Sequence, residues 1–392
     1  MPATEHYIPL SRAQVVETIA ADLKGEQRTL FLSFTKLLSA WYHYQFHARL
    51  EQMKADFQQV QSNSLDKNPV SFAAELDAVA REANFAPISQ HDLDQSLAEE
   101  SVFKLRLFVD FADFSEIVFY SRGTSQQTAM VSSWLGLRKS QIEFTNFEQV
   151  LVYIRFKPAS YFSDDQKRSF NPGSVVLKLF KNIPKADVEM LFPNTVIRMR
   201  LTDKLIIGIP AFFSGVIALT TKVGSSLILL GAILGFWLGF RSEPVSITQA
   251  ELVVIATGAG AVGAYLWKQF NSFKNRKIRF MKALTENLYF KNMDNDIGVL
   301  TNIIDYAEES ECKEVILAYG ELVIDGPMQA SKLIEAIEQR LPTGTQFDIH
   351  DAIEKLDELA LINISDGILT AVPFRDAIAN LDASWDRLFA PQ

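Results

Sequence analysis

The sequence contains a single cysteine, Cys312, among its 392 residues. One cysteine excludes an intramolecular disulfide bond and any zinc site built from several cysteines. The N-terminal residues lack a basic stretch followed by an apolar core, so no signal peptide is visible, and their acidic residues are unlike a mitochondrial transit peptide. The N-terminal domain is therefore expected to stay on the side of a membrane where it is made.

Positive charge is scarce toward the C-terminus. Residues 284–392 contain 21 acidic and 7 basic residues, a net charge of −14, whereas residues 1–283 contain 26 acidic and 31 basic residues, a net charge of +5. An acidic surface repels the phosphates of nucleic acids, while a mildly basic one can lie against anionic lipid. This asymmetry argues against nucleic acid as a partner and for membrane lipid as one.

The sequence also lacks a P-loop, a nucleophile elbow and a recognisable Ser/His/Asp spacing. A glycine-rich pattern at Gly258, Gly260 and Gly263 lacks the acidic residue about 20 positions later that would hold a ribose, so no cofactor is predicted. Small residues at four-residue spacing are typical of membrane helices that pack closely. The predicted packing faces consist of Gly231, Gly235 and Gly239 on one segment and Ala256, Gly260 and Ala264 on the next.

The longest apolar run extends over residues 205–240 and contains one charged residue, Lys222. A straight helix of that length would extend about 54 Å, well beyond the roughly 30 Å of a hydrocarbon core, so a single crossing does not fit. Basic residues flank the apolar region 205–267 on both sides, which predicts an even number of crossings. We expect a hairpin of two spans, 223–240 and 252–267, with 205–221 as either a third span or an interfacial segment.

Before this region, the pattern changes from helical to strand-like. Apolar residues recur every three or four positions in 30–57 and 71–85, as in amphipathic helices. From Val102 onward, four runs rich in Val, Ile, Phe and Tyr show partial alternation and are separated by turn-forming residues. They lie at 103–111, 116–123, 149–157 and 174–181. Residues 1–200 are thus predicted to form an N-terminal α+β domain in which helices cover an antiparallel sheet of about four strands.

Residues 268–392 are predicted to form an acidic helical domain that ends like a winged helix. Amphipathic helices at 331–341 and 348–362 precede two short strands that turn at Asp366-Gly367, and a final helix follows. The usual partner of a winged helix is DNA, but the second helix presents four acidic residues against Lys355 alone. DNA binding through this helix is therefore not expected.

Three residues on the first long helix form a candidate metal site. His43, His47 and Glu51 follow one another at four-residue spacing, so their side chains could face one way. Two histidines and a carboxylate are ligands that zinc or iron accepts. The alternative is an aromatic-rich helix whose histidines form hydrogen bonds at a packing surface.

A run of carboxylates forms a candidate catalytic site. Asp305, Glu308 and Glu309, followed by Glu311 and Glu314, occupy neighbouring turns of one predicted helix. Carboxylates at this spacing can pair as acid and base or hold a hard cation. The alternative is that these carboxylates form a solvent-exposed helix face or pair with a basic surface nearby.

A resemblance to a known family spans nearly the whole chain. It is carried by LKLFKNIPKADVEMLFPNTVIRMRLTDKLIIGIPA at 177–211 and ENLYFKNMDNDIGVLTNIIDYAEESECKEVILAY at 286–319, supported by YHYQFHARLEQMK at 42–54 and LDASWDRLF at 381–389. These stretches resemble the uncharacterised membrane proteins catalogued as domain-of-unknown-function family 3754, which includes the mitochondrial transmembrane protein one-four-three. The resemblance implies membrane attachment and carries over no catalytic residues. QQVQSNSLDKN at 58–68 departs from the family, where a turn with Pro and Asp is expected.

These observations predict an α+β membrane-anchored protein with an N-terminal helical and antiparallel-sheet domain, a transmembrane helical hairpin and a C-terminal winged-helix-like domain. Its expected role is that of an interaction or scaffold protein that presents both domains on one membrane face to protein partners or lipid, with homo-oligomers forming through the membrane helices. The alternative is a membrane-surface enzyme that uses the acidic helix 305–314 or the histidine site. The expected location is a bacterial inner membrane with both domains in the cytoplasm, or the mitochondrial inner membrane for an organellar protein.

Overall fold

The computed structural model describes residues 7–61, 69–89, 106–133, 138–163, 171–198, 224–240 and 248–388. The chain divides into two compact units. Unit 1 consists of Met1–Val102, Asp110–Leu191 and Lys291–Gln392, and unit 2 consists of Phe103–Val109 and Phe192–Phe290. Unit 1 therefore joins segments from both ends of the chain.

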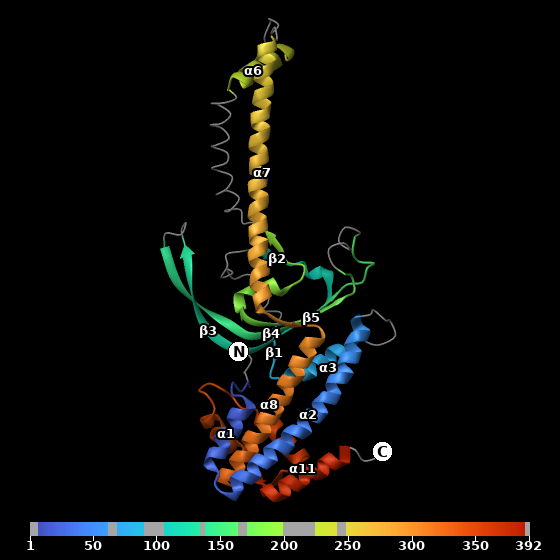
Figure 1. Ribbon diagram of the computed structural model, residues 1–392, viewed down its shortest axis with the longest axis vertical. Helices are drawn as coiled ribbons and strands as arrows, with labels where there is room; N and C mark the ends of the chain where they lie inside the picture. The colour runs from blue at the N-terminus through green and yellow to red at the C-terminus, as the bar shows by residue number, and fades with distance from the viewer. Residues whose placement is uncertain are drawn as a thin grey trace. The chain divides into compact units, whose positions relative to one another are not determined.

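The helical half of unit 1 is built around one buried helix, α8 (Ile297–Asp325; Figure 1). The helices that pack against α8 are α1 (Arg12–Asp22), α2 (Glu26–Gln61), α3 (Pro69–Glu82), α9 (Ala330–Arg340) and α10 (Ile349–Glu358), while α11 (Phe374–Leu388) packs on α2. Apolar residues from all of them form one continuous hydrophobic cluster. A helix enclosed on most sides needs apolar residues around most of its circumference, which α8 has.

Local hydrogen bonds determine where two of these helices begin. Helix α1 starts with a capping box, in which the hydroxyl of Ser11 accepts from the backbone N–H of Gln14 and the Gln14 side chain accepts from that of Ser11. Asp348 caps the start of helix α10, and its carboxylate accepts hydrogen bonds from the backbone N–H groups of His350 and Asp351. Both caps satisfy N–H groups that have no partner within the helix.

The main sheet of unit 1 has five antiparallel strands in the order β1 (Ala86–Pro87), β3 (Phe114–Ser133), β4 (Arg138–Phe156), β5 (Val175–Pro184) and β7 (Asn292–Asn295). Strand β4 is buried on both faces. Leu151 and Tyr153 belong to the helical core, whereas Val150 and Val152 are buried outside it, on the alternate face, and the short helix η3 (Lys185–Leu191) contacts this strand. The near-continuous apolar run of this strand follows from burial on both sides.

The C-terminal part of unit 1 has the element order of a winged helix. After α8 come a short strand β8 (Met328–Gln329), α9, α10 and the hairpin of β9 (Ile362–Ser365) and β10 (Ile368–Ala371), and β10 pairs with both other strands. The hairpin turns at Asp366 and Gly367, which have φ angles of 53° and 75°. Two consecutive positive φ angles are those of a type I′ turn, as the Asp-Gly sequence predicts.

Unit 2 contains β2 (Arg106–Phe108) paired with β6 (Val196–Arg198), helix α6 (Gly224–Trp237) and helix α7 (Gln249–Lys291), whose last residue belongs to unit 1. Gly258, Gly260 and Gly263 lie inside α7, and not in a turn between strand and helix. At Gly231, Gly235 and Gly260 an added Cβ atom would meet no described atom within 4 Å, and Ala256 and Ala264 are exposed.

The predicted transmembrane hairpin is wrong. No helix in the described residues combines the length and the apolar character that a membrane crossing needs. Helix α6 has 14 residues, which extend about 21 Å against a core of about 30 Å. Residues 252–267 form only part of α7, which continues through residues 268–291, seven of which are Lys or Arg. The expected integral location in an inner membrane is overturned by the same finding, and segment 205–221 lies outside the described residues.

Candidate functional site

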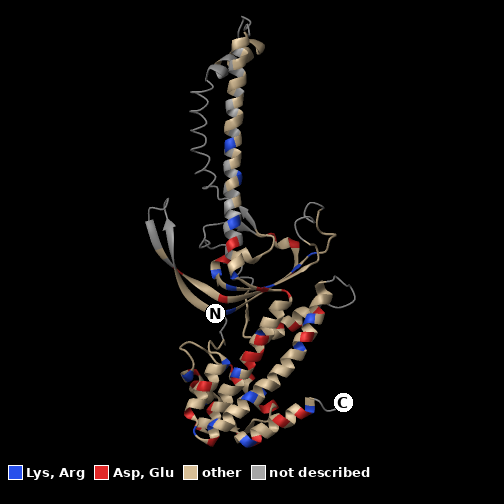
Figure 2. Ribbon diagram, viewed as in Figure 1, with Lys and Arg blue, Asp and Glu red and all other residues tan. Residues whose placement is uncertain are grey.

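Helix α8 is buried yet carries charged residues. Every residue from Ser310 to Leu322 is buried, including Glu311, Lys313 and Glu314. Figure 2 shows the acidic residues along α8 within the helical half of unit 1. Burying a charge is costly unless an opposite charge or hydrogen bonds compensate it, so the partners of these residues decide what this helix can do.

Glu308 is held by side chains that lie far away in the sequence. Its Oε1 accepts a hydrogen bond from Nη1 of Arg12 at 3.2 Å, and its Oε2 lies 2.9 Å from Nδ1 of His43. Glu309 accepts a hydrogen bond from the backbone N–H of Arg12 at 3.2 Å and pairs with Lys313 at 3.6 Å. The structure thus brings one residue of the predicted metal site, His43, to one of the predicted catalytic residues, Glu308.

The other two residues of the predicted metal site have separate neighbours. The rings of His47 and His43 stack with centroids 6.1 Å apart. Glu51 pairs with Lys54 at 2.9 Å, and this hydrogen bond lowers the pKa of Glu51. His43 and Glu51 therefore each have a hydrogen-bond partner outside the set, and metal binding by the three residues stays a prediction.

Asp305 lies one turn before Glu308 on the same helix. Burial and the charge of Glu308 raise the pKa of Asp305, and His43 opposes this shift. A carboxyl group with a raised pKa beside a second carboxylate can exchange a proton with it. The described partners of Glu308 and Glu309 are Arg12, His43 and Lys313, which belong to the protein itself. A catalytic use of Asp305, Glu308 and Glu309 therefore stays a prediction.

A second cluster, which we call the Lys355 cluster, joins α8 to α10. The Nζ of Lys355 lies 2.5 Å from a carboxylate oxygen of Glu311, 2.9 Å from one of Glu314 and 2.5 Å from one of Asp351. Asn84 donates a further hydrogen bond to Glu314 at 3.2 Å. One ammonium group therefore faces three carboxylates, and the only lysine of α10 points into the protein.

The excess of carboxylates changes the protonation of the Lys355 cluster. Burial raises the pKa of Glu311 to about 8, although Lys355 opposes the shift, and burial also raises the pKa of Glu314. Burial lowers the pKa of Lys355, but Glu314, Glu311 and Asp351 together raise it by more. Near pH 7 the cluster is expected to contain a protonated Glu311 and a charged Lys355.

The Lys355 cluster also has the donor set of a cation site. Ligand oxygens of Glu311, Glu314 and Asp351 all lie within 4.8 Å of one another, and carboxylates are the ligands that hard cations prefer. The ammonium group of Lys355 already contacts all three carboxylates. A metal ion would have to displace this paired lysine, so we propose no metal here.

A cleft of about 290 Å³, which we call the acidic cleft, opens beside the Lys355 cluster. Its two basic side chains are already paired, Lys355 with the cluster and Arg49 with Glu82. Glu354 and Glu358 line it from α10, are exposed, and form no ion pair with any residue that the structure describes. Its aromatic wall is formed by Trp41, Tyr42 and Phe46 of α2.

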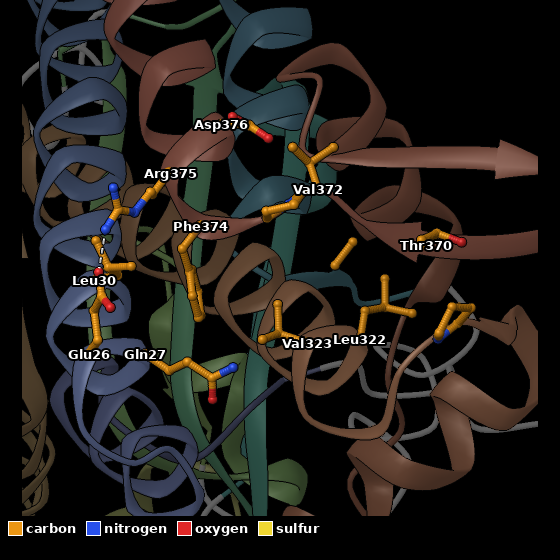
Figure 3. A pocket seen from close by; sticks show the side chains of 13 residues that line it. Glu26, Gln27, Leu30, Leu322, Val323, Thr370, Val372, Phe374, Arg375 and Asp376 are labelled. Carbon is orange, nitrogen blue, oxygen red and sulfur yellow. Dashed lines mark hydrogen bonds and ion pairs between the residues drawn. The ribbon is translucent and has the colours of Figure 1, made fainter.

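A larger hollow, of about 500 Å³, lies where α2 and α11 begin (Figure 3). Apolar side chains such as Leu322 and Phe374 form part of its lining. Figure 3 shows Arg375 reaching Glu26, with which it forms an ion pair. Two charged groups of this hollow therefore already satisfy each other.

Sequence reasoning did not identify all residues of these clusters. Arg12 and Asn84 are separated from their partners Glu308 and Glu314 by 296 and 230 positions, and no local pattern marks such pairs. The bond between Lys355 and Asp351 spans four residues of one helix, which is a spacing that the sequence does show.

The fold defines the class of this protein as α+β, with a five-stranded antiparallel sheet and a winged-helix order of elements in one unit. Residues 147–298 match the model of a family described as "Protein of unknown function (DUF3754)". The matched segment begins in β4 and ends in the first turn of α8, so it excludes the acidic cleft and the Lys355 cluster. It supports the resemblance to this uncharacterised family but says nothing of a membrane or of transmembrane protein one-four-three. No solved structure matches the chain.

Proposed function

We propose that this protein is an interaction module that binds a positively charged segment of a partner protein in the acidic cleft. The observation that carries the proposal is that aromatic walls and unpaired carboxylates line the same cleft, with Trp41 and Tyr42 on α2 and Glu354 and Glu358 on α10. A Lys or Arg side chain gains from both, because aromatic faces attract cations and carboxylates accept charge-assisted hydrogen bonds.

Charge favours a basic partner over a nucleic acid. Residues 284–392, which supply α10, carry a net charge of −14. Lys355 is the one lysine of α10, and its three carboxylate partners leave it no free charge for a phosphate. A field of this sign speeds association with cations and repels polyanions.

The cleft is also pre-organised. Lys355 of α10 forms ion pairs with Glu311 and Glu314 of α8. The buried residues Ala352 and Leu356 of α10 belong to the hydrophobic core. The carboxylates of α10 therefore stand on a fixed helix, which lowers the entropy that binding would otherwise cost.

The double variant Glu354→Lys/Glu358→Lys, which reverses the charge of both carboxylates, tests the proposal. Binding of a fluorescein-labelled peptide rich in Lys and Arg to the full chain is measured by fluorescence anisotropy at several salt concentrations. We expect the wild type to bind it with salt-dependent affinity, and the variant to bind at least about 10-fold more weakly, a change of about 1.4 kcal/mol.

Asp382→Lys/Asp386→Lys is the matched control. Asp382 and Asp386 are also exposed and also four residues apart, but they lie on α11 away from the cleft lining. If both double variants weaken binding equally, attraction is only a matter of net charge and the proposal fails. It fails as well if the wild type binds the basic peptide no better than one of the same length rich in Ser and Gly.

A further inference from the structure

Arg122 is a buried cation whose hydrogen-bonding capacity the described residues do not meet. It lies on β3 with 5% of its surface exposed, and its Nε and Nη1 atoms are buried without a hydrogen-bond partner in the described structure. Buried N–H groups nearly always have an acceptor, since leaving one unpaired costs the full desolvation of the group. Two donors of this guanidinium therefore have no acceptor in the described structure.

Aromatic rings surround this guanidinium. The rings of Tyr7 and Tyr306 each have their centroid 4.4 Å from Cζ of Arg122, and the ring of Phe85 lies at 5.6 Å. Ring faces stabilise the charge, but they do not replace an oxygen in the plane of the guanidinium. The side chain of Tyr7 also forms a hydrogen bond with the guanidinium, so the atoms left without an acceptor in the described structure are Nε and Nη1.

A second buried cation, Lys313, increases the local positive charge. Its Nζ donates to the backbone carbonyls of Ile8 at 3.1 Å and Leu10 at 2.9 Å, and pairs with Glu309 at 3.6 Å. Burial lowers the pKa of Arg122 and that of Lys313, and Glu309 is a carboxylate that opposes the shift at both. Two buried cations thus share the charge of Glu309, which is itself partly exposed.

The cross-strand neighbour of Arg122 carries an acceptor that has no partner in the described structure. Gln149 of β4 is the cross-strand partner of Arg122, so both side chains stand on the same face of the sheet. The amide nitrogen of Gln149 donates to the hydroxyl of Tyr306 at 3.1 Å, while its Oε1 is buried without a partner among the described residues. A ligand here meets two donors and one acceptor.

We propose that Arg122, Gln149 and Lys313 form a binding site for a small oxyanion that also carries a hydroxyl group, as hydrogenphosphate or a hydroxycarboxylate does. Its negative oxygens accept from the guanidinium edge of Arg122 and balance the charge of the two cations, and its hydroxyl group donates to Oε1 of Gln149. We call this set the Arg122 site. It differs from the acidic cleft in its position and in binding a negatively charged ligand instead of a positively charged one.

The segment Tyr7–Leu10 covers the Arg122 site. Tyr7 contacts the guanidinium with its ring, Ile8 is 1% exposed, and Lys313 holds the backbone of the segment through two carbonyls. Because the unpaired atoms are enclosed, an anion reaches them only when this segment lifts. The segment is tied to Lys313 by two hydrogen bonds, which can open and close again without unfolding the sheet.

Equilibrium binding of inorganic phosphate to the full chain tests the proposal. The protein is dialysed against radiolabelled phosphate at constant ionic strength set with chloride, and bound phosphate is counted. We expect saturable binding of one phosphate per chain and at least a 10-fold loss of affinity in Arg122→Gln. The half-buried Arg155 of β4 gives a matched control, and Arg155→Gln is expected to bind as the wild type does.

Gln149→Met keeps the size of the side chain and leaves Arg122 intact, so it tests the site even if Arg122→Gln does not fold. We expect several-fold weaker binding of phosphate and of glycolate by this variant, and no change for acetate, which has no hydroxyl group. Glycolate and phosphate arms separate a carboxylate ligand from a phosphate ligand.

Three results would overturn the proposal: none of the three anions binds above the chloride background, Arg122→Gln binds phosphate with unchanged affinity, or Arg155→Gln weakens binding as much as Arg122→Gln does. Equal affinity of the wild type for glycolate and acetate would remove the role assigned to Gln149.

Discussion

The Lys355 cluster and the Arg122 site both border α8, and they carry opposite imbalances of charge. In the Lys355 cluster three carboxylates surround one ammonium group, which contacts each of them at 2.9 Å or less. In the Arg122 site Lys313 pairs with Glu309, whose charge also acts on Arg122, and two guanidinium nitrogens lack an acceptor in the described structure. A buried charge whose partners the chain supplies contributes to the fold, whereas one with unmet donors leaves an interaction for a ligand to make.

The largest effect is expected from Lys355→Met. It removes the ammonium group and leaves Glu314 buried without its cation, beside the buried Glu311 and the half-exposed Asp351, so the free energy of unfolding should fall by about 3–5 kcal/mol. Urea unfolding followed by circular dichroism measures this change. Lys332→Met on the exposed face of α9 is the control and should change the free energy by less than about 0.5 kcal/mol. A loss below about 1 kcal/mol for Lys355→Met would mean that the cluster does not hold α10 to α8.

A smaller, pH-dependent effect is expected from Glu311→Gln. The pKa of Glu311 is about 8 in the folded protein and ordinary carboxyl groups titrate near 4.3, so the folded state binds the extra proton between these values. The stability of the wild type should therefore fall as pH rises, by about 2 kcal/mol from pH 6 to pH 8. In Glu311→Gln the free energy of unfolding should not show this fall, because the amide does not titrate. Urea unfolding at several pH values measures the difference, and parallel pH profiles for the two proteins would contradict the prediction.

The smallest effect is expected from Arg122→Met in chloride buffer. The variant loses the contacts of the cation with Tyr7 and Tyr306, but it also removes two buried donors without acceptors, so the free energy of unfolding should change by no more than about 1 kcal/mol. Adding phosphate should stabilise the wild type and not the variant. A loss of 3 kcal/mol or more without phosphate would show that Arg122 already has a full set of partners, as Lys355 has.

The predicted elements with a regular period are present in the structure. The amphipathic helices α9, α10 and α11 and the turn at Asp366 and Gly367 lie where the spacing of apolar residues and the turn sequence place them. The strand-like runs beginning near 116, 149 and 174 become β3, β4 and β5 of one antiparallel sheet. The run at 103–111 contains β2, which pairs with β6 in unit 2 and not with that sheet.

The predicted membrane spans were wrong because they rested on apolar composition, which does not show where a helix begins or ends. Residues 252–267 are apolar, but in the structure they are a part of α7, which continues through a charged stretch. Among the described residues, the apolar residues 224–237 form a helix of 14 residues. The positions of its two ends set the length of a helix, and this length decides whether the helix can span a bilayer.

The sequence by itself determined the local features of this protein: the helical and strand periods, the turn at Asp366-Gly367, and the net charges of the two parts of the chain. Only the tertiary structure decided that α8 passes through the helical core, that Glu308 meets Arg12 and His43, and that Arg122 lies beneath Tyr7 beside Gln149. The reason is physical. Caps, periods and turns depend on residues within a few positions of one another, whereas burial and the pairing of charges depend on which distant segments pack together, and a single sequence does not show that.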